Sequence, residues 1–216
     1  MRRGFSLVEL LVTLAVAALL AALAIPAMAR ALFRARVAKA MAELQGVEAA
    51  LEAYAADHKG HYPPVTASCQ SGDAAEDLQL PPELAEGEYL PRRAGASTST
   101  ILEDPFRKGA TYRYVAPETY RQNGQLMPGS YTLWVPEDFP ACRSESGSGM
   151  RGAECPMAWA IWSVGPPVAG GGPVEDYRLP LRAALWHSGG TTAGIVGRIR
   201  AKGGASFSTM GGAGER

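Results

Sequence analysis

The sequence predicts an α+β protein in which a long N-terminal helix packs on a small antiparallel β-sheet. Hydrophobic residues run almost unbroken near the N-terminus and then recur at three- and four-residue steps, which is typical of one long helix. Glycine and proline number 25 and 16, and they concentrate after the first sixty positions, where short aromatic and β-branched runs indicate strands joined by turns.

The length of 216 residues suits one folded domain with appendages. Lys plus Arg and Asp plus Glu both number 21, so the zero formal charge gives no overall attraction to nucleic acid or anionic lipid. We expect a leader at 1–4, a transmembrane segment at 5–29, an amphipathic helix half at 30–60, a head at 61–202 and a flexible tail at 203–216.

The segment 5–29 is almost entirely hydrophobic and follows the basic start Met1-Arg2-Arg3. As a helix, about 25 residues would extend roughly 37 Å, which is long enough to cross a bilayer. The positive residues in front predict a cytoplasmic N-terminus, with the rest of the chain on the other side.

Two other interpretations account for the same segment. A secretory signal peptide also has a basic start and an apolar core, and Ala27-Met28-Ala29 would serve as its cleavage site. Arg2-Arg3-Gly4-Phe5 faintly resembles a twin-arginine signal. Neither signal needs Glu9. A carboxylate near the bilayer centre costs about 2.5–3.5 kcal/mol on insertion scales, so Glu9 should have a partner.

Residues Gly4-Phe5-Ser6-Leu7-Val8-Glu9-Leu10 resemble the cleavage motif of type IV prepilins and type II secretion pseudopilins. The resemblance implies that a prepilin peptidase cuts between Gly4 and Phe5 and methylates the new amine of Phe5. It also implies that Glu9 meets the amine of a neighbouring subunit and sets the axial register of assembly. A free amine titrates near pH ~8 and is largely cationic at neutral pH, so such a pair is physically reasonable.

Pro26 lies near the outer end of the apolar segment, where proline predicts a kink or a local break of the helix. Charges follow at Arg30, Arg34, Arg36 and Lys39. These residues either contact lipid headgroups or form the solvated start of a soluble helix, and we prefer the second interpretation.

An apolar stripe continues the helix and needs a partner, which we expect to be a sheet formed by later residues. The stripe consists of Val37, Met41, Leu44, Val47, Leu51 and Tyr54. Gly60 followed by Pro63-Pro64 predicts the end of the helix. Asp73 is a candidate cap for a short helix ending at Leu80.

Four runs of aromatic and β-branched residues predict strands of the head. They are 110–115, 131–135, 158–164 and, more weakly, 194–200.

The cysteines are Cys69, Cys142 and Cys155. Cys142 and Cys155 close a short polar loop and predict a disulfide, which would need an oxidising compartment and would stabilise the fold by roughly 3 kcal/mol. Two unpaired thiols are the alternative, and Cys69 is assigned no role.

Further stretches resemble the major (G-type) pseudopilins of type II secretion, and their order along the chain agrees with that family. They are Tyr54 to Pro63 at the helix exit, Asp104-Pro105-Phe106 with Tyr112-Arg113-Tyr114, and Ile161 to Gly165 followed by Glu175-Asp176. The greater length and the Cys142–Cys155 loop favour a minor pilin or an unusual pseudopilin over the bulk subunit.

In those pseudopilins the last loop binds calcium through acidic residues, but here Pro167 and Arg178 stand where acids are expected. Ser163, Glu175 and Asp176 would supply only part of the six to eight oxygens that calcium takes. A glycine-rich turn without metal is the preferred interpretation, so we expect no cofactor.

The resemblance implies a filament subunit held in the inner membrane by one span, with a periplasmic head, that later joins a periplasmic or cell-surface filament. Its implied partners are other pilin or pseudopilin subunits, the prepilin peptidase, the inner-membrane assembly platform and membrane lipid. We find no nucleophile motif or phosphate-binding loop, and we interpret His58 and His61 as surface residues, so no enzyme is expected.

Two alternatives stay open. One is a minor pilin for adhesion or DNA uptake, with a phosphate-contacting patch of Arg198, Arg200, Lys202 and Arg107-Lys108. The other is a periplasmic binding domain behind a signal peptide.

Overall fold

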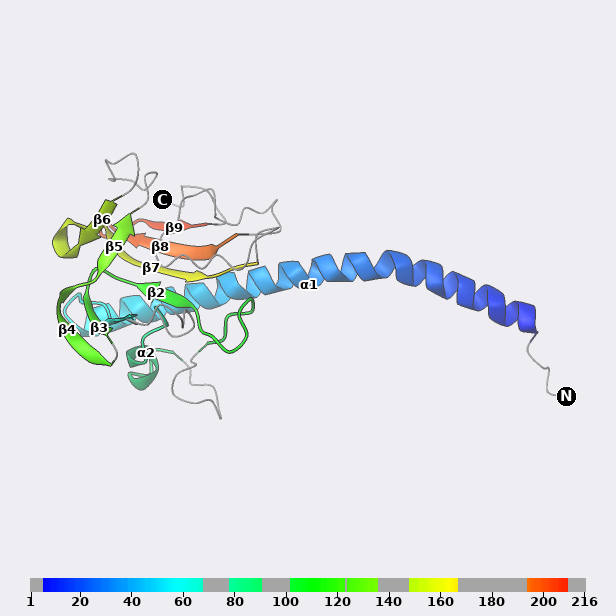
Figure 1. The fold of residues 1–216 in the computed structure, drawn as a ribbon, viewed down its shortest axis with the longest axis horizontal. Coiled ribbons are helices and arrows are strands. Elements are labelled where there is room, and N and C mark those ends of the chain that lie inside the picture. The colour runs from blue at the N-terminus through cyan, green and yellow to red at the C-terminus, as the bar shows by residue number, and fades with distance from the viewer. Residues whose placement is uncertain are drawn as a thin grey trace. The chain divides into compact units, whose positions relative to one another are not determined.

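A computed structural model of the chain describes residues 6–67, 78–90, 102–122, 124–135, 148–166 and 194–209. The elements are α1 (Leu7–Asp57), β1 (Val65–Ala67), α2 (Glu83–Glu86), β2 (Arg113–Val115), β3 (Thr119–Gln122), β4 (Gln125–Ser130), β5 (Thr132–Val135), β6 (Ser148–Arg151), the 3-10 turn η1 (Gly152–Glu154), β7 (Met157–Ser163), β8 (Val196–Ala201) and β9 (Ser206–Ser208). A long N-terminal helix precedes a head of β-sheets (Figure 1), which confirms the predicted α+β, pilin-like layout.

The chain divides into two compact units, Met1–Ala38 and Lys39–Arg216. In the first unit α1 is uninterrupted at Pro26. A local break of the helix at this position is therefore wrong, whereas the alternative expectation of a kink stays a prediction. Proline removes one backbone hydrogen bond, and the alanine-rich turns on both sides maintain the helix.

The principal sheet of the second unit is antiparallel, with the strand order β2-β7-β8-β9. Its register places Tyr114 opposite Ile161 and Ile161 opposite Arg198. The part of α1 that belongs to this unit lies along the sheet (Figure 1). Of the predicted apolar stripe in this unit, Leu44, Val47 and Leu51 are buried, while Met41 and Tyr54 are half-buried. The buried helix residues in this unit are Ala40, Leu44, Val47, Ala50, Leu51 and Ala55.

The sheet content differs from the single antiparallel sheet that we expected. A second sheet has the order β1-β3-β4, in which β1 runs parallel to β3 and β3 antiparallel to β4. A third sheet is the antiparallel pair β5-β6. Strands as short as β1, with three residues, carry too little alternation to be recognised in sequence.

The four predicted strands are confirmed as β2, β5, β7 and β8, with boundaries shifted by one to three residues. The predicted flexible tail from 203 is wrong for β9, which pairs with β8 through Ile199 and Phe207. The short helix expected up to Leu80 is also wrong at its end, because Gln79 bridges to Arg113 and the helix α2 begins only after Pro82.

The end of α1 agrees with prediction. Gly60 adopts a φ of +86° and donates its N–H to the carbonyl of Ala55 at 2.7 Å. Only glycine takes this left-handed conformation without steric cost, so the cap satisfies a terminal carbonyl and turns the chain away from the helix.

Candidate functional site

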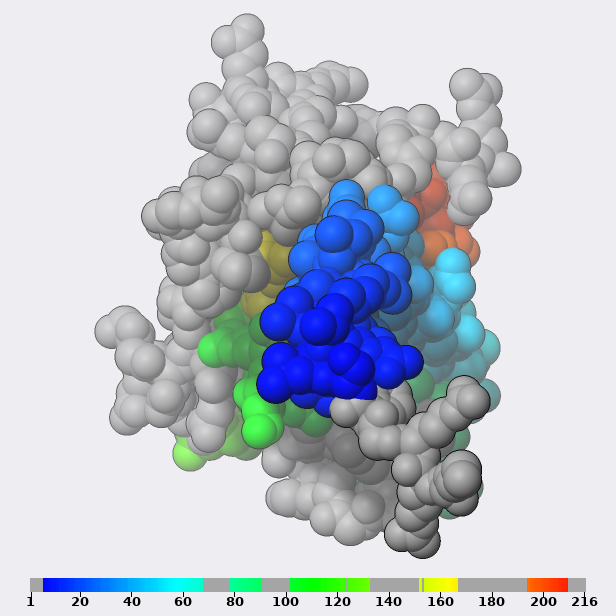
Figure 2. All heavy atoms as spheres, turned by 90° about the vertical axis from the view of Figure 1, so that its right-hand side faces the viewer, coloured from blue at the N-terminus to red at the C-terminus, as the bar shows by residue number. Residues whose placement is uncertain are grey.

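The apolar N-terminal segment of α1 is the first candidate site. Every residue from 6 to 32 is exposed in the single chain, and Leu19 and Leu23 expose 65% and 68% of their surface. These exposed atoms appear in blue in Figure 2. Among the described residues, α1 is the one helix long and apolar enough to cross a membrane. So large an apolar surface requires lipid or other helices around it.

Glu9 is the acidic residue in the first turn of α1 and is exposed in the single chain. A carboxylate at a helix N-terminus interacts favourably with the helix dipole, but that interaction is worth less than the cost of carrying the charge into lipid. No group in the described part of the chain bonds to the carboxylate of Glu9. Gly4 and Phe5, the predicted cleavage residues, lie outside the described residues.

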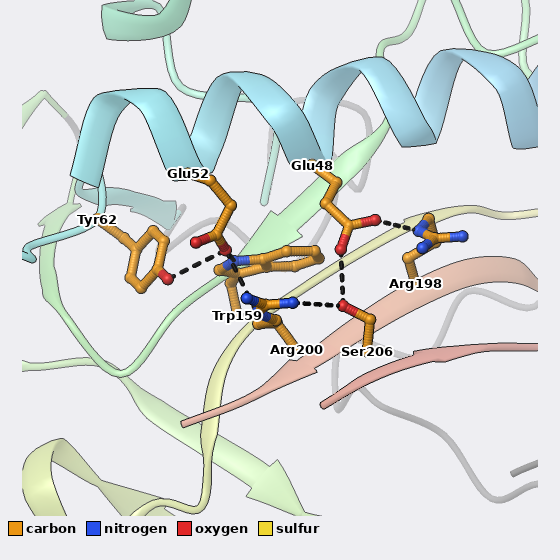
Figure 3. A network of polar contacts seen from close by, with 7 residues as sticks. All are labelled: Glu48, Glu52, Tyr62, Trp159, Arg198, Arg200 and Ser206. Carbon is orange, nitrogen blue, oxygen red and sulfur yellow. Dashed lines mark hydrogen bonds and ion pairs between the residues drawn. The ribbon is translucent and has the colours of Figure 1, made fainter. Parts of the chain in front are cut away.

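A second group of carboxylates lies on the other half of α1, where it faces the principal sheet. Glu52 accepts hydrogen bonds from the indole N–H of Trp159 at 3.0 Å and from the hydroxyl of Tyr62 at 3.2 Å. Its Oε1 lies 3.5 Å from Nε of Arg200. Figure 3 shows these side chains converging between the helix and the strands. One carboxylate thereby binds β7, β8 and the helix exit together.

Glu48 makes a parallel set of contacts one turn earlier (Figure 3). Its Oε2 accepts a hydrogen bond from Nε of Arg198, and its Oε1 accepts one from the hydroxyl of Ser206 at 2.7 Å. Arg200 donates to the same hydroxyl at 2.9 Å. Glu48 therefore connects the helix to β8 and β9, and the strand that was expected to be flexible is held by it.

Glu43 completes this series, since its Oε2 accepts a hydrogen bond from the hydroxyl of Tyr112 at 2.5 Å. We call Glu43, Glu48 and Glu52 the glutamate seam. Its partners come from separate parts of the head, so the seam determines the position of the helix along the sheet and the rotation of the helix about its own axis.

Burial, followed by the contact with Glu52, raises the pKa of Tyr62 to about 12. Burial raises the pKa of Tyr112 further still, and Glu43 adds to that shift.

Asp104 joins two of the stretches that carried the resemblance to pseudopilins. Its Oδ1 accepts hydrogen bonds from the N–H of Phe106 at 2.9 Å and the hydroxyl of Ser163 at 2.7 Å. Its Oδ2 accepts one from the N–H of Val164 at 3.1 Å. Burial raises the pKa of Asp104, although these hydrogen bonds oppose the shift. The Asp-Pro-aromatic turn and the end of β7 thus form one structural unit.

The calcium and disulfide predictions both reach beyond the described residues. Ser163 is buried and donates its hydroxyl to Asp104, while Glu175 and Asp176 lie outside the described ranges. The described residues contain no cluster of three or more metal-ligating side chains. Cys155 is a buried free thiol and its pKa is raised by burial, but Cys142 is outside the described part, so the disulfide stays an unconfirmed prediction.

The histidines near the helix exit are exposed, as predicted. The ring of His58 stacks on Tyr54 with centroids 3.8 Å apart, and its Nδ1 lies 2.8 Å from the carbonyl oxygen of Tyr54. Nδ1 of His61 lies 3.3 Å from the Glu118 carboxylate. These contacts position the helix exit.

Two of the five basic residues considered for nucleic acid are engaged inside the head. Arg198 and Arg200 face the glutamate seam, with 12% and 28% of their side chains exposed. Lys202 donates to the carbonyl of Gly152 at 2.6 Å. Two of the arginines that were expected to contact phosphate are thus already paired with carboxylates, which argues against this patch.

Sequence reasoning missed the glutamate seam because glutamates on a helix are usually solvated.

A family model described as the prokaryotic N-terminal methylation motif matches residues 1–25. No curated protein and no solved structure matches the chain. The matched motif supports a subunit of the type IV pilin or pseudopilin kind that a prepilin peptidase processes, and it favours a structural subunit over an enzyme. The match covers most of the apolar segment of α1 and ends at residue 25, so the role of the head has to be argued from its own geometry.

Proposed function

We propose that this chain is a filament subunit that is cut between Gly4 and Phe5, methylated on the Phe5 amine and assembled through the apolar half of α1. The observation that carries the proposal is the exposed apolar helix with one carboxylate, Glu9, in its first turn, inside the range that matches the methylation motif. An unpaired carboxylate is costly there unless another chain neutralises it.

Before assembly the segment Leu7–Ala29 lies in the inner membrane, with the N-terminus in the cytoplasm and the head in the periplasm. The assembly platform then extracts the subunit, and its apolar helix exchanges lipid for the helices of other subunits. Glu9 pairs with the cationic amine of a neighbouring Phe5, so a subunit misplaced by one helical turn leaves both charges unpaired. The pair selects the axial register.

Within this class we propose a pseudopilin-like head, in a minor or unusual subunit. The support is that the helix exit, the Asp104 turn and the end of β7 are linked by hydrogen bonds in the order that the resemblance implies: the hydroxyl of Tyr114 donates to the carbonyl of Pro63 at 2.9 Å, and that of Ser163 donates to Asp104. The additional β5-β6 pair, which falls between β4 and β7 in the sequence and forms a sheet of its own, favours a specialised subunit.

Mass spectrometry of the mature protein tests the proposal. We expect a mature N-terminus at a methylated Phe5. Cleavage after Ala29 would overturn it and would support a signal peptide instead.

Two matched variants sharpen this test. Gly4→Leu should leave the precursor uncut, because a bulky residue replaces the small one at the scissile bond. Ala29→Leu removes a small residue that a signal peptidase needs and should leave processing at Phe5 unchanged. The opposite result, with Ala29→Leu blocking maturation, would contradict the proposal.

A further inference from the structure

Three arginines follow the apolar segment of α1, and none of them has a role in the proposed function. Arg30, Arg34 and Arg36 are all exposed, and they lie on the same uninterrupted helix as the segment Leu7–Ala29. We call these three residues the arginine collar. From the sequence we preferred a solvated helix start over contact with lipid headgroups for these charges. The structure adds that the helix runs through Pro26 without interruption, so their distance from the span is fixed by helix geometry.

The continuity of the helix determines the depth of the collar. Leu7–Ala29 extends about 34 Å at 1.5 Å per residue, close to the roughly 30 Å of a hydrocarbon core. Arg30 then falls at the outer edge of that core, and Arg36 lies about 9 Å farther out. The headgroup layer on each side is roughly 5–8 Å thick, so the long arginine side chains all reach it.

The direction of the side chains brings the guanidinium groups nearer to the lipid. Side chains of a helix tilt towards its N-terminus, which for this segment is the membrane side. Arg30 shows this tilt, since its Nε donates to the carbonyl of Pro26 at 3.2 Å. At 3.6 residues per turn Arg34 is about 40° from Arg30 in one direction, and Arg36 is about 120° from Arg30 in the other. The three side chains therefore cover a sector of about 160°, which is one broad face of the helix where it emerges from lipid.

The collar is also a local excess of positive charge in a chain that is neutral overall. The sequence holds no acidic residue between Glu9 and Glu43. The next cation, Lys39, is different, because its Nζ lies 3.7 Å from Glu43 one turn later. No acidic side chain lies within two helical turns before or one turn after the collar in the sequence, so an anionic partner would have to come from outside this part of the helix.

We infer that the arginine collar binds the phosphate headgroups of anionic phospholipids in the outer leaflet of the membrane that holds the subunit. The inference rests on the membrane-anchored state in the proposed function and adds a partner surface to it. A basic residue close to an anionic membrane surface gains about 1 kcal/mol, which corresponds to roughly fivefold in association. The collar thus retains the subunit in anionic lipid until assembly removes it.

The test uses the full chain reconstituted in phosphatidylcholine bilayers that contain a trace of spin-labelled lipid. The motionally restricted fraction is compared for labelled phosphatidylglycerol and labelled phosphatidylcholine. We expect phosphatidylglycerol to be preferred by roughly fivefold at the helix, with the preference falling as salt is added. The variant R30Q/R34Q/R36Q should lose the preference, and R30K/R34K/R36K should keep it.

A head variant of matched charge, K59Q/K108Q/K202Q, should keep the wild-type preference. Equal preference in wild type and R30Q/R34Q/R36Q would overturn the inference, and so would loss of preference in the head variant. A chain that fails to enter the bilayer would instead contradict the proposed membrane anchor. Unchanged lipid preference with weakened self-association in R30Q/R34Q/R36Q would show that the collar contacts a second copy of the chain, which also overturns it.

Discussion

Between Leu7 and Ala29 the side chains of α1 are exposed and, apart from Glu9 and Thr13, apolar, whereas from Ala40 to Ala55 every third or fourth side chain is buried in the head. Both stretches belong to one continuous helix. The carboxylates differ in the same way. Glu48 and Glu52 are bonded to strands of the same chain, and Glu9 has no bonded group among the described residues. One half of the helix is packed within the subunit, and the other half exposes an apolar surface that lipid or other helices must cover.

The largest expected effect concerns the exposed half of the helix. Glu9→Val should leave processing at Phe5 and the unfolding of the head unchanged but should lower incorporation into filaments on the order of 100-fold. The neighbour's amine is then left without a counter-charge, and an unpaired charge in lipid costs about 2.5–3.5 kcal/mol. Quantifying the subunit in sheared filaments measures this loss.

Glu9→Gln serves as the control for shape, because it keeps the length of the side chain and removes the charge. It should assemble as poorly as Glu9→Val. Wild-type incorporation of either variant would contradict the pairing role.

The second prediction compares two leucines on the same helix. Leu51 is 0% exposed and Leu19 is 65% exposed. Leu51→Ala should lower the free energy of unfolding of the head by about 2–5 kcal/mol, because it leaves a cavity in the core. Leu19→Ala should leave the denaturation midpoint of the head unchanged and reduce assembly instead. If both substitutions shifted that midpoint equally, the contrast between the halves would be wrong.

The third prediction concerns the glutamate seam. Glu48→Ala leaves the guanidinium of Arg198, which exposes 12% of its side chain, without its carboxylate. We expect a loss of about 1–3 kcal/mol in the free energy of unfolding, measured by urea denaturation. Gln45→Ala, at an exposed position on the same helix, is the matched control and should change stability by less than about 0.5 kcal/mol. Equal stability of the two variants would show that the seam is not stabilising.

The smallest expected effect is an alkaline loss of stability in the head. The pKa of Tyr62 is raised to about 12, so above its ordinary value the unfolded chain releases this proton while the folded head retains it. Stability should therefore fall as the pH rises between about 10 and 12. The pKa values of Tyr112 and Tyr114 are shifted in the same direction and add to the loss.

Denaturation midpoints measured across this pH window test the prediction. Tyr62→Phe should have a shallower decline than wild type. An identical pH profile in this variant would show that Tyr62 does not contribute.

Much of the architecture could be predicted because hydrophobic spacing is a local signal. The buried stripe through Leu44, Val47 and Leu51 followed from three- and four-residue spacing, and the end of α1 followed from Gly60. The parallel pairing of β1 with β3 could not be predicted, since Val65 and Tyr120 become partners only when the intervening chain has folded. For the same reason β9 was taken for a tail.

The sequence by itself determined the apolar segment, the position of Glu9 in it and the likeness to processed filament subunits, because these depend on the order of residues along one helix. The tertiary structure decided which glutamates become part of the head and which cations remain available. Glu48 and Glu52 find Arg198 and Arg200 across 150 and 148 positions of the chain. Contacts over such separations depend on how strands align beside the helix, and no local pattern encodes that alignment.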